Sequence, residues 1–520
     1  MRLFTPTTRT TVTRTITTRR FLTHRVLSAT RTTTTITTNH HGSHIRAYSS
    51  EKGTTPPSPL SSHQSQSQSQ SQSSTFNPET YLQTATTTLS LIPPKLIPDT
   101  LHPTQSHLLS LALSSHLPSI CLPPGFNSSS PSSSTPIFPW PTNQEEEYNQ
   151  LQLPPGYHLI YYPLQTPPHL LFPDGTDADH CPGSPFTRRM WAGGRIEFGK
   201  GSGERFKVDG RKTICVETLG EPVLQVGKDG KEEEQRVWVD VWRRYFTFPP
   251  EEGMGRGEME RVVEGVVDDL QNEAAGAQDG GSETAKGSKG VISELRRLVF
   301  LREREPSPNH QNQTQQKLEP APARVIRVPH QPDFFFKMTP DATLLFQFSA
   351  LTFNAHAIHL NPLYAREVEG YKERLMHGPL TLVVMLRGVE GFLRGGTSGA
   401  GAGSTMTAAA ADSAGTQISE AIRERLFVVP GDEPEDDGKK KKKQWEIANI
   451  EYKNLRPLFV GEEMKVCIRL LPNKEKKSDG DGDRAGLSGL DGGRRERVDV
   501  WIEAPDGGLA VKGTVGVEWR

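Results

Sequence analysis

The sequence predicts an α+β protein in which antiparallel strands wrap a buried helix. A stretch beginning at Gly378 is too apolar for a surface helix, so it is expected to be buried. Its apolar residues include Leu380, Leu382, Val383, Leu386, Val389 and Phe392. Five later segments carry the alternating or β-branched pattern of strands. They are residues 424–430, 445–455, 463–471, 497–504 and 509–519. A buried helix wrapped by antiparallel strands is the hot-dog arrangement.

The domain that holds this helix is expected to cover residues 324–520. Residues 325–328 and 334–336 are predicted strands, because β-branched and aromatic residues dominate them. Thr339 and Pro340 predict a helix start, since threonine can cap a helix and proline fits its first turn. Apolar residues then follow at helical spacing, at Leu344, Leu345, Phe348 and Leu351.

An earlier domain is expected over residues 76–250. A short helix is predicted after Pro103, and strands are predicted at residues 158–162, 205–219 and 237–242. Residues 251–323 are rich in Gly, Glu, Gln and Pro and are predicted to be a long disordered linker. Within that linker, residues 291–302 are expected to hold at most a helical turn.

Composition bounds the remaining possibilities. The formal net charge of −1 gives no global basic field, so nucleic acid is not an expected partner. No apolar run reaches the roughly 18 residues of a membrane-spanning helix. The four cysteines form no CxxC pair, so neither a metal site nor a disulfide framework is predicted, and no cofactor is expected. A glycine-rich insert is expected at about 395–413.

The N-terminus is expected to be a targeting segment. Residues 1–50 contain many Arg, Thr and Ser but no Asp or Glu, which is the composition of a mitochondrial transit peptide. Arg46 to Ser50 has the form of a processing site. Residues 51–75, with alternating Ser and Gln, form a predicted disordered linker. The expected location is therefore the mitochondrial matrix.

Polar residues cluster just before the buried helix. Asn354, His356, His359 and His377 lie among apolar segments, which predicts a polar pocket in an apolar wall. His359 is a candidate acid/base, because the unperturbed pKa of histidine lies near neutrality. Gly378 opens the helix, where a backbone N–H at the positive end of the helix dipole can stabilise a developing oxyanion.

Residues 353–359 resemble the hydratase motif Gly-Asp-x-Asn-Pro-x-His of MaoC-like dehydratases. Residues 349–380 more closely resemble the branch typified by hydroxyacyl-thioester dehydratase type 2 and mesaconyl-C4-CoA hydratase. Residues 172–194, which begin Phe-Pro-Asp-Gly-Thr, and the Arg-Arg-Tyr at 243–245 resemble the N-terminal hot-dog domain of that branch. The resemblance covers about 150–250 and 324–520. It implies a double hot-dog fold, with a degenerate N-terminal unit and a catalytic C-terminal unit.

The resemblance also implies roles for individual residues. His359 falls on the catalytic histidine, Asn354 on the usual catalytic aspartate and His356 on the asparagine of the motif. Because a carboxamide cannot take a proton, Asn354 is expected only to orient water or substrate. Gly378 matches the backbone amide that binds the thioester. His377, Arg188 and Arg189 are further candidates for substrate binding. For His377 a structural role is also open, and the two arginines can equally be paired at the surface.

The implied function is dehydration of (3R)-hydroxyacyl thioesters of acyl carrier protein or CoA in mitochondrial fatty acid synthesis. One alternative is hydration of branched dicarboxylic thioesters, as by a mesaconyl-C4-CoA hydratase. Another is an acyl-thioester-binding subunit without catalysis, which Asn354 would allow. The two hot-dog units can form a pseudo-dimer within one chain, and a homodimer is also open.

Overall fold

The computed structural model describes fourteen stretches of the chain, all in the compact unit Ser74–Arg520. They are residues 76–124, 126, 152–199, 201–202, 206–227, 234–247, 257, 261, 264–265, 292–303, 325–395, 420–427, 444–472 and 494–520. The expected transit peptide, the Ser/Gln segment and the glycine-rich insert after Gly395 lie outside the described residues.

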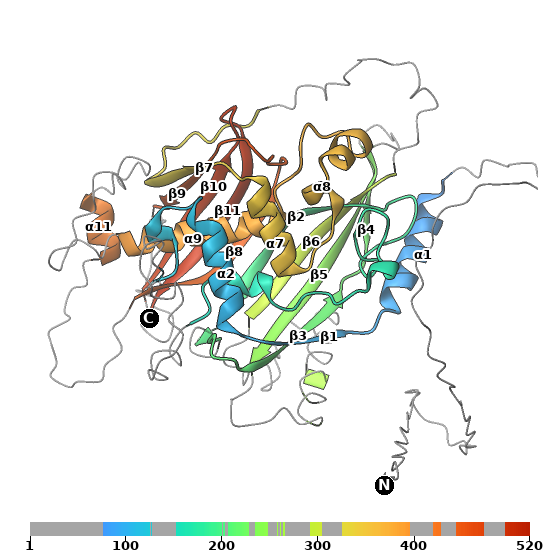
Figure 1. Cartoon of the computed structure of the whole chain (residues 1–520), viewed down its shortest axis with the longest axis horizontal. Coiled ribbons are helices and arrows are strands. Elements are labelled where there is room, and N and C mark those ends of the chain that lie inside the picture. The colour runs from blue at the N-terminus through green and yellow to red at the C-terminus, as the bar shows by residue number, and fades with distance from the viewer. Residues whose placement is uncertain are drawn as a thin grey trace, which may run out of the picture. The chain divides into compact units, whose positions relative to one another are not determined.

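One antiparallel sheet of eleven strands organises this unit (Figure 1). Its order is β1 (Lys95–Thr100), β3 (Lys212–Leu219), β5 (Arg236–Thr247), β6 (Ile292–Leu301), β2 (Arg188–Phe198), β8 (Trp445–Asn454), β11 (Leu509–Trp519), β10 (Arg495–Glu503), β9 (Met464–Leu470) and β7 (Phe334–Met338). A short strand, β4 (Val223–Gln225), pairs with β5. The core strands alternate buried and partly exposed residues, as in an antiparallel sheet with one packed face.

The sheet contains the same arrangement twice. In each half, the first strand along the chain lies at the outer edge of the whole sheet, and the second strand lies at the centre of the whole sheet. The later long strands of that half lie between these two. The halves are β1-β3-β5-β6-β2 and β7-β9-β10-β11-β8, and they meet where β2 pairs with β8. At this junction Ile196 lies opposite Ile450, and both are buried. The predicted α+β double hot-dog fold is confirmed.

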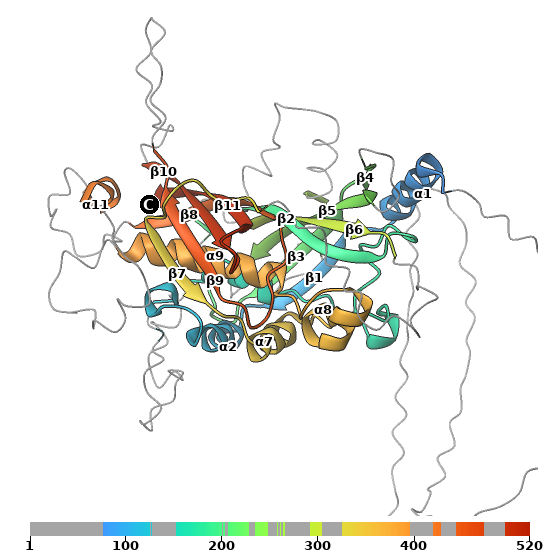
Figure 2. The same cartoon turned by 90° about the horizontal axis from the view of Figure 1, so that it is seen from above.

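The central helix of the second half is α9 (Gly378–Gly395), which begins at the predicted residue. It packs against β8, β9 and β10, and Figure 2 shows it lying against this half of the sheet. Gly388 permits this approach, since a Cβ there would lie 3.1 Å from Phe336 and 3.2 Å from Ile468. The buried face of α9, which includes Leu382 and Phe392, forms the centre of the main core.

Shorter helices surround the sheet. In the first half they are α1 (Pro78–Ser90), α2 (Pro103–Ser114) and the 3-10 turns η1 (Ser119–Cys121), η2 (Tyr157–Ile160) and η3 (Pro168–Leu170). In the second half they are α7 (Ala342–Thr352), α8 (Ala357–Leu360), the π-helix η5 (Tyr364–Val368) and α11 (Glu420–Phe427). α2 and α7, which each follow the edge strand of their half, pack against one another.

Three segments differ in type from the expectation. Residues 158–162 form turn η2 and its end rather than a strand, because an unbroken apolar run does not separate a strand from a buried turn. Residues 424–430 were expected to be a strand, but α11 covers 420–427, where Glu and Arg favour a helix. Residues 325–328 form no strand, although Ile326 O accepts a hydrogen bond from Leu509 N.

The largest correction concerns the predicted linker 251–323. Residues 292–301 within it form β6, a ten-residue strand in the middle of the first half, rather than a helical turn. Glu294 and Arg296 interrupt the apolar pattern of this strand, but the Glu294 side chain is buried and hydrogen-bonded to Arg296. Helix α7 also starts later than predicted, because Asp341 rather than Thr339 caps it by accepting from Leu344 N.

Among the described residues, no helix is long and apolar enough to cross a membrane. The same part of the chain contains no cluster of His, Cys, Asp and Glu that could hold a metal ion.

Candidate active site

The turn between α7 and α8 positions the first part of the site. Phe353 ends α7 in the left-handed region, with φ of 53°, which turns the chain sharply. Asn354 Oδ1 then accepts a hydrogen bond from His356 N at 3.0 Å, which is a standard way for asparagine to hold a turn. The single turn of α8 follows and carries His359. The local sequence therefore brings the side chains of His356 and His359 together, with ring centroids 5.5 Å apart.

His359 is held in one tautomer. Its Nδ1 lies 2.8 Å from the backbone oxygen of Leu375, and because that oxygen can only accept, Nδ1 carries the proton. The lone pair is left on Nε2. Burial lowers the pKa of His359 to about 4, and the nearby Arg189 charge acts in the same direction. At neutral pH His359 is therefore an uncharged imidazole that can accept a proton.

His377 lies behind His359. The two rings are stacked, with centroids 3.7 Å apart and planes 22° apart. Ser349 Oγ lies 2.8 Å from His377 Nε2 and holds that ring in place. Burial and the neighbouring His359 both hold the pKa of His377 well below its usual value. The stacked pair thus fixes the orientation of His359 without adding charge.

Gly378 begins α9 directly after His377, where the first amides of a helix have no partner within it. A Cβ at Gly378 would lie 2.9 Å from both Cβ and Cγ of Trp191, so glycine is required for this close approach. Trp191 is fixed from two sides. Its Nε1 donates to Tyr452 Oη at 2.7 Å, and its backbone oxygen accepts from Asn454 Nδ2 at 2.8 Å.

The first half of the chain contributes a chain of buried ion pairs. Arg189 Nη1 lies 2.8 Å from Asp177 Oδ2 and 3.4 Å from His180 Nδ1. His180 Nε2 lies 2.9 Å from Glu217 Oε1, and Arg243 Nε donates to Glu217 Oε2 at 2.6 Å. The Arg243 and His180 side chains hold the pKa of the Glu217 carboxyl well below its usual value despite burial. This network anchors Arg189 beside the histidines.

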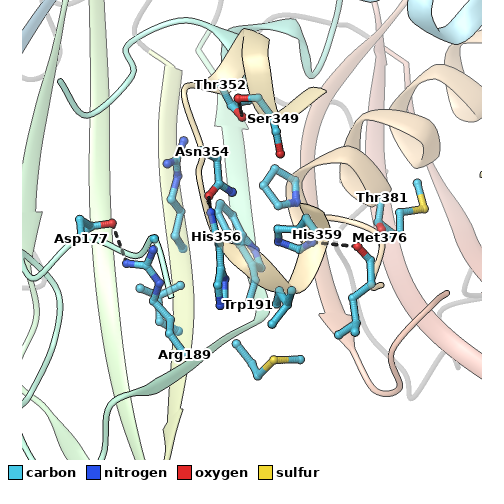
Figure 3. Close-up of a pocket in the computed structure, with 18 of the residues that line it drawn as sticks. Asp177, Arg189, Trp191, Ser349, Thr352, Asn354, His356, His359, Met376 and Thr381 are labelled. Carbon is cyan, nitrogen blue, oxygen red and sulfur yellow. Dashed lines mark hydrogen bonds and ion pairs between the residues drawn. The ribbon is translucent and has the colours of Figure 1, made fainter. Parts of the chain in front are cut away.

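A cavity of about 860 Å³ joins these groups, and both halves of the double hot dog line it. Figure 3 shows Arg189 and Asp177 on one side of His356, and His359 and Thr381 on the other. The second half supplies Asn354, His356, His359 and Gly378. The first half supplies Tyr162, Arg189, Trp191, Arg243 and Arg296 among others. The cavity is large enough for a small organic ligand.

The structure gathers most of the residues predicted from the sequence, but not all of them. The cavity described above is lined by Asn354, His356, His359, Gly378 and Arg189. His377 is fully buried behind His359 and does not line the cavity. Arg188 is paired with Glu369, with Nη2 at 2.5 Å from Oε2, and is not part of the cavity wall.

Sequence reasoning missed three residues that position the site. Ser349 and Trp191 lie in segments that carry the resemblance, but their roles depend on contacts made in the folded chain. Asp174, which lies near His356, sits in a Pro-Asp-Gly segment that signals a turn but not a contact 182 positions further along the chain.

A model of one known protein family matches the part of the chain that contains this site. A model of the family described as hydroxyacyl-thioester dehydratase type 2 matches residues 156–247 and 232–398. These matches contain the first-half segment with Arg189 and Trp191 and the second-half segment with Asn354, His359 and Gly378. The predicted resemblance is therefore confirmed.

Two curated relatives share parts of the sequence. The chain is 46% identical over 67 residues to the mesaconyl-C(4)-CoA hydratase of Chloroflexus aurantiacus, covering 13% of this chain and 24% of that protein. It is 26% identical over 238 residues to the mitochondrial hydroxyacyl-thioester dehydratase type 2 of Schizosaccharomyces pombe, covering 45% of this chain and 66% of that protein. The matches thus span less than two thirds of either relative.

Solved structures with a similar arrangement include a MaoC-like dehydratase from Phytophthora capsici, with 12% identity and a TM-score of 0.41. That match covers 83% of this chain and 97% of the other. A conserved hypothetical protein from Mycobacterium tuberculosis with a double hot-dog fold has 8% identity and a TM-score of 0.37, with 83% and 97% covered.

Proposed function

We propose that the chain, which the hydroxyacyl-thioester dehydratase type 2 family model matches over residues 156–398, is a hydro-lyase of acyl thioesters. It removes water from (3R)-hydroxyacyl thioesters of CoA or acyl carrier protein to give trans-2-enoyl thioesters, and hydration is the reverse. One observation carries this proposal. A neutral histidine with one free nitrogen lies in the same buried cavity as the start of helix α9.

The proposed mechanism uses these two groups together. His359 Nε2 takes the α-proton, and the electron pair of that C–H bond forms the new double bond as the β-hydroxyl leaves. The amide of Gly378, at the positive end of the α9 dipole, stabilises the negative charge that builds on the thioester oxygen. The proton returns to the departing hydroxyl through His359 or an ordered water, so one water is released and no charge is left behind.

Asn354 has a different role in this mechanism. Its Oδ1 accepts from His356 N, so this oxygen holds the turn rather than the substrate. Asn354 also lines the cavity, where its amide group can orient water or the β-hydroxyl. Proton transfer is therefore assigned to histidine alone, which separates this site from sites with a catalytic aspartate.

The setting of the reaction is also part of the proposal. The acid-free, arginine-rich residues 1–50 and the mitochondrial relative in Schizosaccharomyces pombe support import into mitochondria. We place the enzyme in the matrix, in fatty acid synthesis. An intact N-terminus on protein from purified mitochondria would contradict import with processing.

A second candidate substrate class is a thioester whose acyl group carries its own carboxylate. Arg189, Arg243 and Arg296 line the first-half side of the cavity, which is unusual for a purely apolar acyl chain. Each of the three is paired with a carboxylate, namely Asp177, Glu217 and Glu294. The relative named mesaconyl-C(4)-CoA hydratase makes this candidate worth testing beside the first.

The test is turnover by protein lacking residues 1–50 of saturated-chain and carboxylated trans-2-enoyl thioesters, on CoA and on acyl carrier protein. Hydration, followed as loss of the enoyl absorbance, supports the proposal and ranks the two substrate classes. Binding without turnover of any thioester would instead identify a non-catalytic acyl-thioester-binding subunit.

A further inference from the structure

The turn that carries Asn354 and His356 is clamped by a loop from the other half of the molecule. Gly175 sits against the backbone of Ala355, where a Cβ would come within 2.2 Å of the Ala355 oxygen. Its φ of +82° also favours glycine. The adjoining Asp174 accepts a hydrogen bond from Ala357 N through its backbone oxygen at 2.7 Å. The clamp therefore places Asp174 next to His356 by backbone contacts alone.

The Asp174 carboxylate is itself fixed in direction. Its Oδ1 accepts from Thr176 N at 2.9 Å and from Thr176 Oγ1 at 2.7 Å. A further hydrogen bond across the loop joins Phe172 N to Thr176 O. With Oδ1 occupied, Oδ2 faces His356 Nε2 at 3.6 Å, and both side chains are largely buried. This separation is longer than a hydrogen bond, and catalytic contacts commonly tighten when substrate binds.

We infer that Asp174, supplied by the first hot-dog unit, is a positioning residue that sets the tautomer and orientation of His356 in the cavity. A carboxylate can only accept, so it favours the proton of neutral His356 on Nε2 and leaves the lone pair on Nδ1.

This inference rests on the proposed hydro-lyase function and deepens it. Asn354 stands where a catalytic carboxylate is usual, and Asp174 restores a carboxylate to the histidine cluster from 180 positions earlier in the chain. His356 lines the cavity, but Asp174 does not. The Asp174 carboxylate therefore acts through His356 rather than on the substrate. The first unit thus supplies part of the site as well as its wall.

The decisive variant is Asp174→Asn. Its amide oxygen can still accept from Thr176 N and keep the turn, while its amide nitrogen then faces His356 Nε2 as a donor and reverses the favoured tautomer. Asp209→Asn is the matched control, since Asp209 is a similarly buried carboxylate that pairs with Arg211 away from the cavity. Thermal melts of all variants check that they fold.

The first readout is hydration of the trans-2-enoyl-CoA that the parent turns over fastest. We expect Asp174→Asn to lower kcat at least about 10-fold with little change in KM, and Asp209→Asn to stay within about 2-fold. In a His356→Ala background, Asp174→Asn is expected to have little further effect, because the two residues act as a unit. An equal loss in both backgrounds would overturn the inference.

The second readout is the imidazole nitrogen NMR spectrum of histidine-labelled protein. His356 is expected to carry its proton on Nε2 in the parent and on Nδ1 in Asp174→Asn. The same tautomer in both proteins would also overturn the inference. This measurement needs no turnover, so it separates a failure of the Asp174 assignment from a failure of the proposed hydro-lyase function.

Discussion

The two halves of this molecule share a strand order but differ in what they bury. The second half buries an 18-residue helix, α9, and places a histidine cluster at its start. In the first half, the described residues between α2 and β2 form no helix beyond the short 3-10 turns η1, η2 and η3, and buried ion pairs around Glu217 and Glu294 lie in the interior. The difference shows that one scaffold can be repeated while helix, cavity and charge are divided unequally between the copies.

The start of the central element makes this contrast sharpest. Gly378 opens α9 against Trp191, and Gly156 precedes η2 against Leu386, 3.1 Å from where a Cβ would lie. Of these two glycines, only Gly378 lies next to the cluster of His356, His359 and His377 and lines the cavity.

Among the variants that compare the two halves, the largest expected effect follows from that pair of glycines. Gly378→Ala is expected to lower kcat/KM about 100-fold, because the added Cβ displaces the amide that faces the developing oxyanion. Gly156→Ala is expected to lower the melting temperature, since φ of +89° is strained for alanine, but to leave activity per folded molecule nearly unchanged. Equal losses of activity in the two variants would remove the distinction between the halves.

The buried charges of the first half should matter for stability more than for chemistry. Glu217→Gln leaves Arg243 buried without its charged partner and is expected to lower the free energy of unfolding by about 3 kcal/mol. Denaturant unfolding measures this value. A matched change at an exposed pair, Glu463→Gln beside Lys337, is expected to cost less than about 1 kcal/mol. Similar costs at both sites would contradict the structural role of the buried network.

Acid should destabilise both halves through buried neutral histidines. Burial lowers the pKa of His158 and of His359 to about 4, below the value of about 6.5 in an unfolded chain. Between these two pH values the unfolded state binds a proton that the folded state does not bind. The free energy of unfolding is therefore highest above pH 6.5 and falls as the pH is lowered toward 4. Each such histidine contributes up to about 1.4 kcal/mol per pH unit.

A pH series of denaturant unfolding curves checks this prediction, with His158→Phe as the first-half variant. His158→Phe removes one buried titrating group, so the free energy of unfolding should depend less on pH in this variant. His330→Ala, at an exposed position, should leave that pH dependence unchanged. No loss of stability between pH 6.5 and 4 in the parent would show that these rings are not held neutral.

The smallest expected effect separates two neighbouring arginines. Arg188→Met removes a pair with Glu369 outside the cavity and is expected to change kcat/KM by less than about 2-fold. Arg189→Met, inside the cavity, is expected to raise KM for a carboxylated enoyl thioester more than for a saturated-chain one. If Arg188→Met had the larger effect on KM, substrate would have to reach beyond the cavity described above.

The sequence predicted those parts of the fold that have regular apolar patterns. Helix α9 and strands β8 to β11 were found because their apolar residues repeat with the helical or strand period. Strand β6 was missed because Glu294 and Arg296 pair inside the protein and break the apolar pattern. Residues 158–162 were predicted to be a strand, but these five residues are all buried and carry no period that separates a strand from a turn.

The candidate site divides in the same way. Asn354, His359 and Gly378 were found because they lie within 25 positions of one another and carry a motif. Asp174 and Trp191 reach the site only after β2 pairs with β8, so their roles depend on a contact between the two halves. No local pattern could have placed Asp174 opposite His356.

The account depends most directly on His359 as the group that moves the proton. The measurement is hydration of a trans-2-enoyl-CoA by the parent and by His359→Gln, with His330→Ala as the surface control. We expect the parent and His330→Ala to be equally active and His359→Gln to lose about 100-fold or more, with the fold retained. Unchanged activity in His359→Gln would contradict the assignment of the chemistry to the second half.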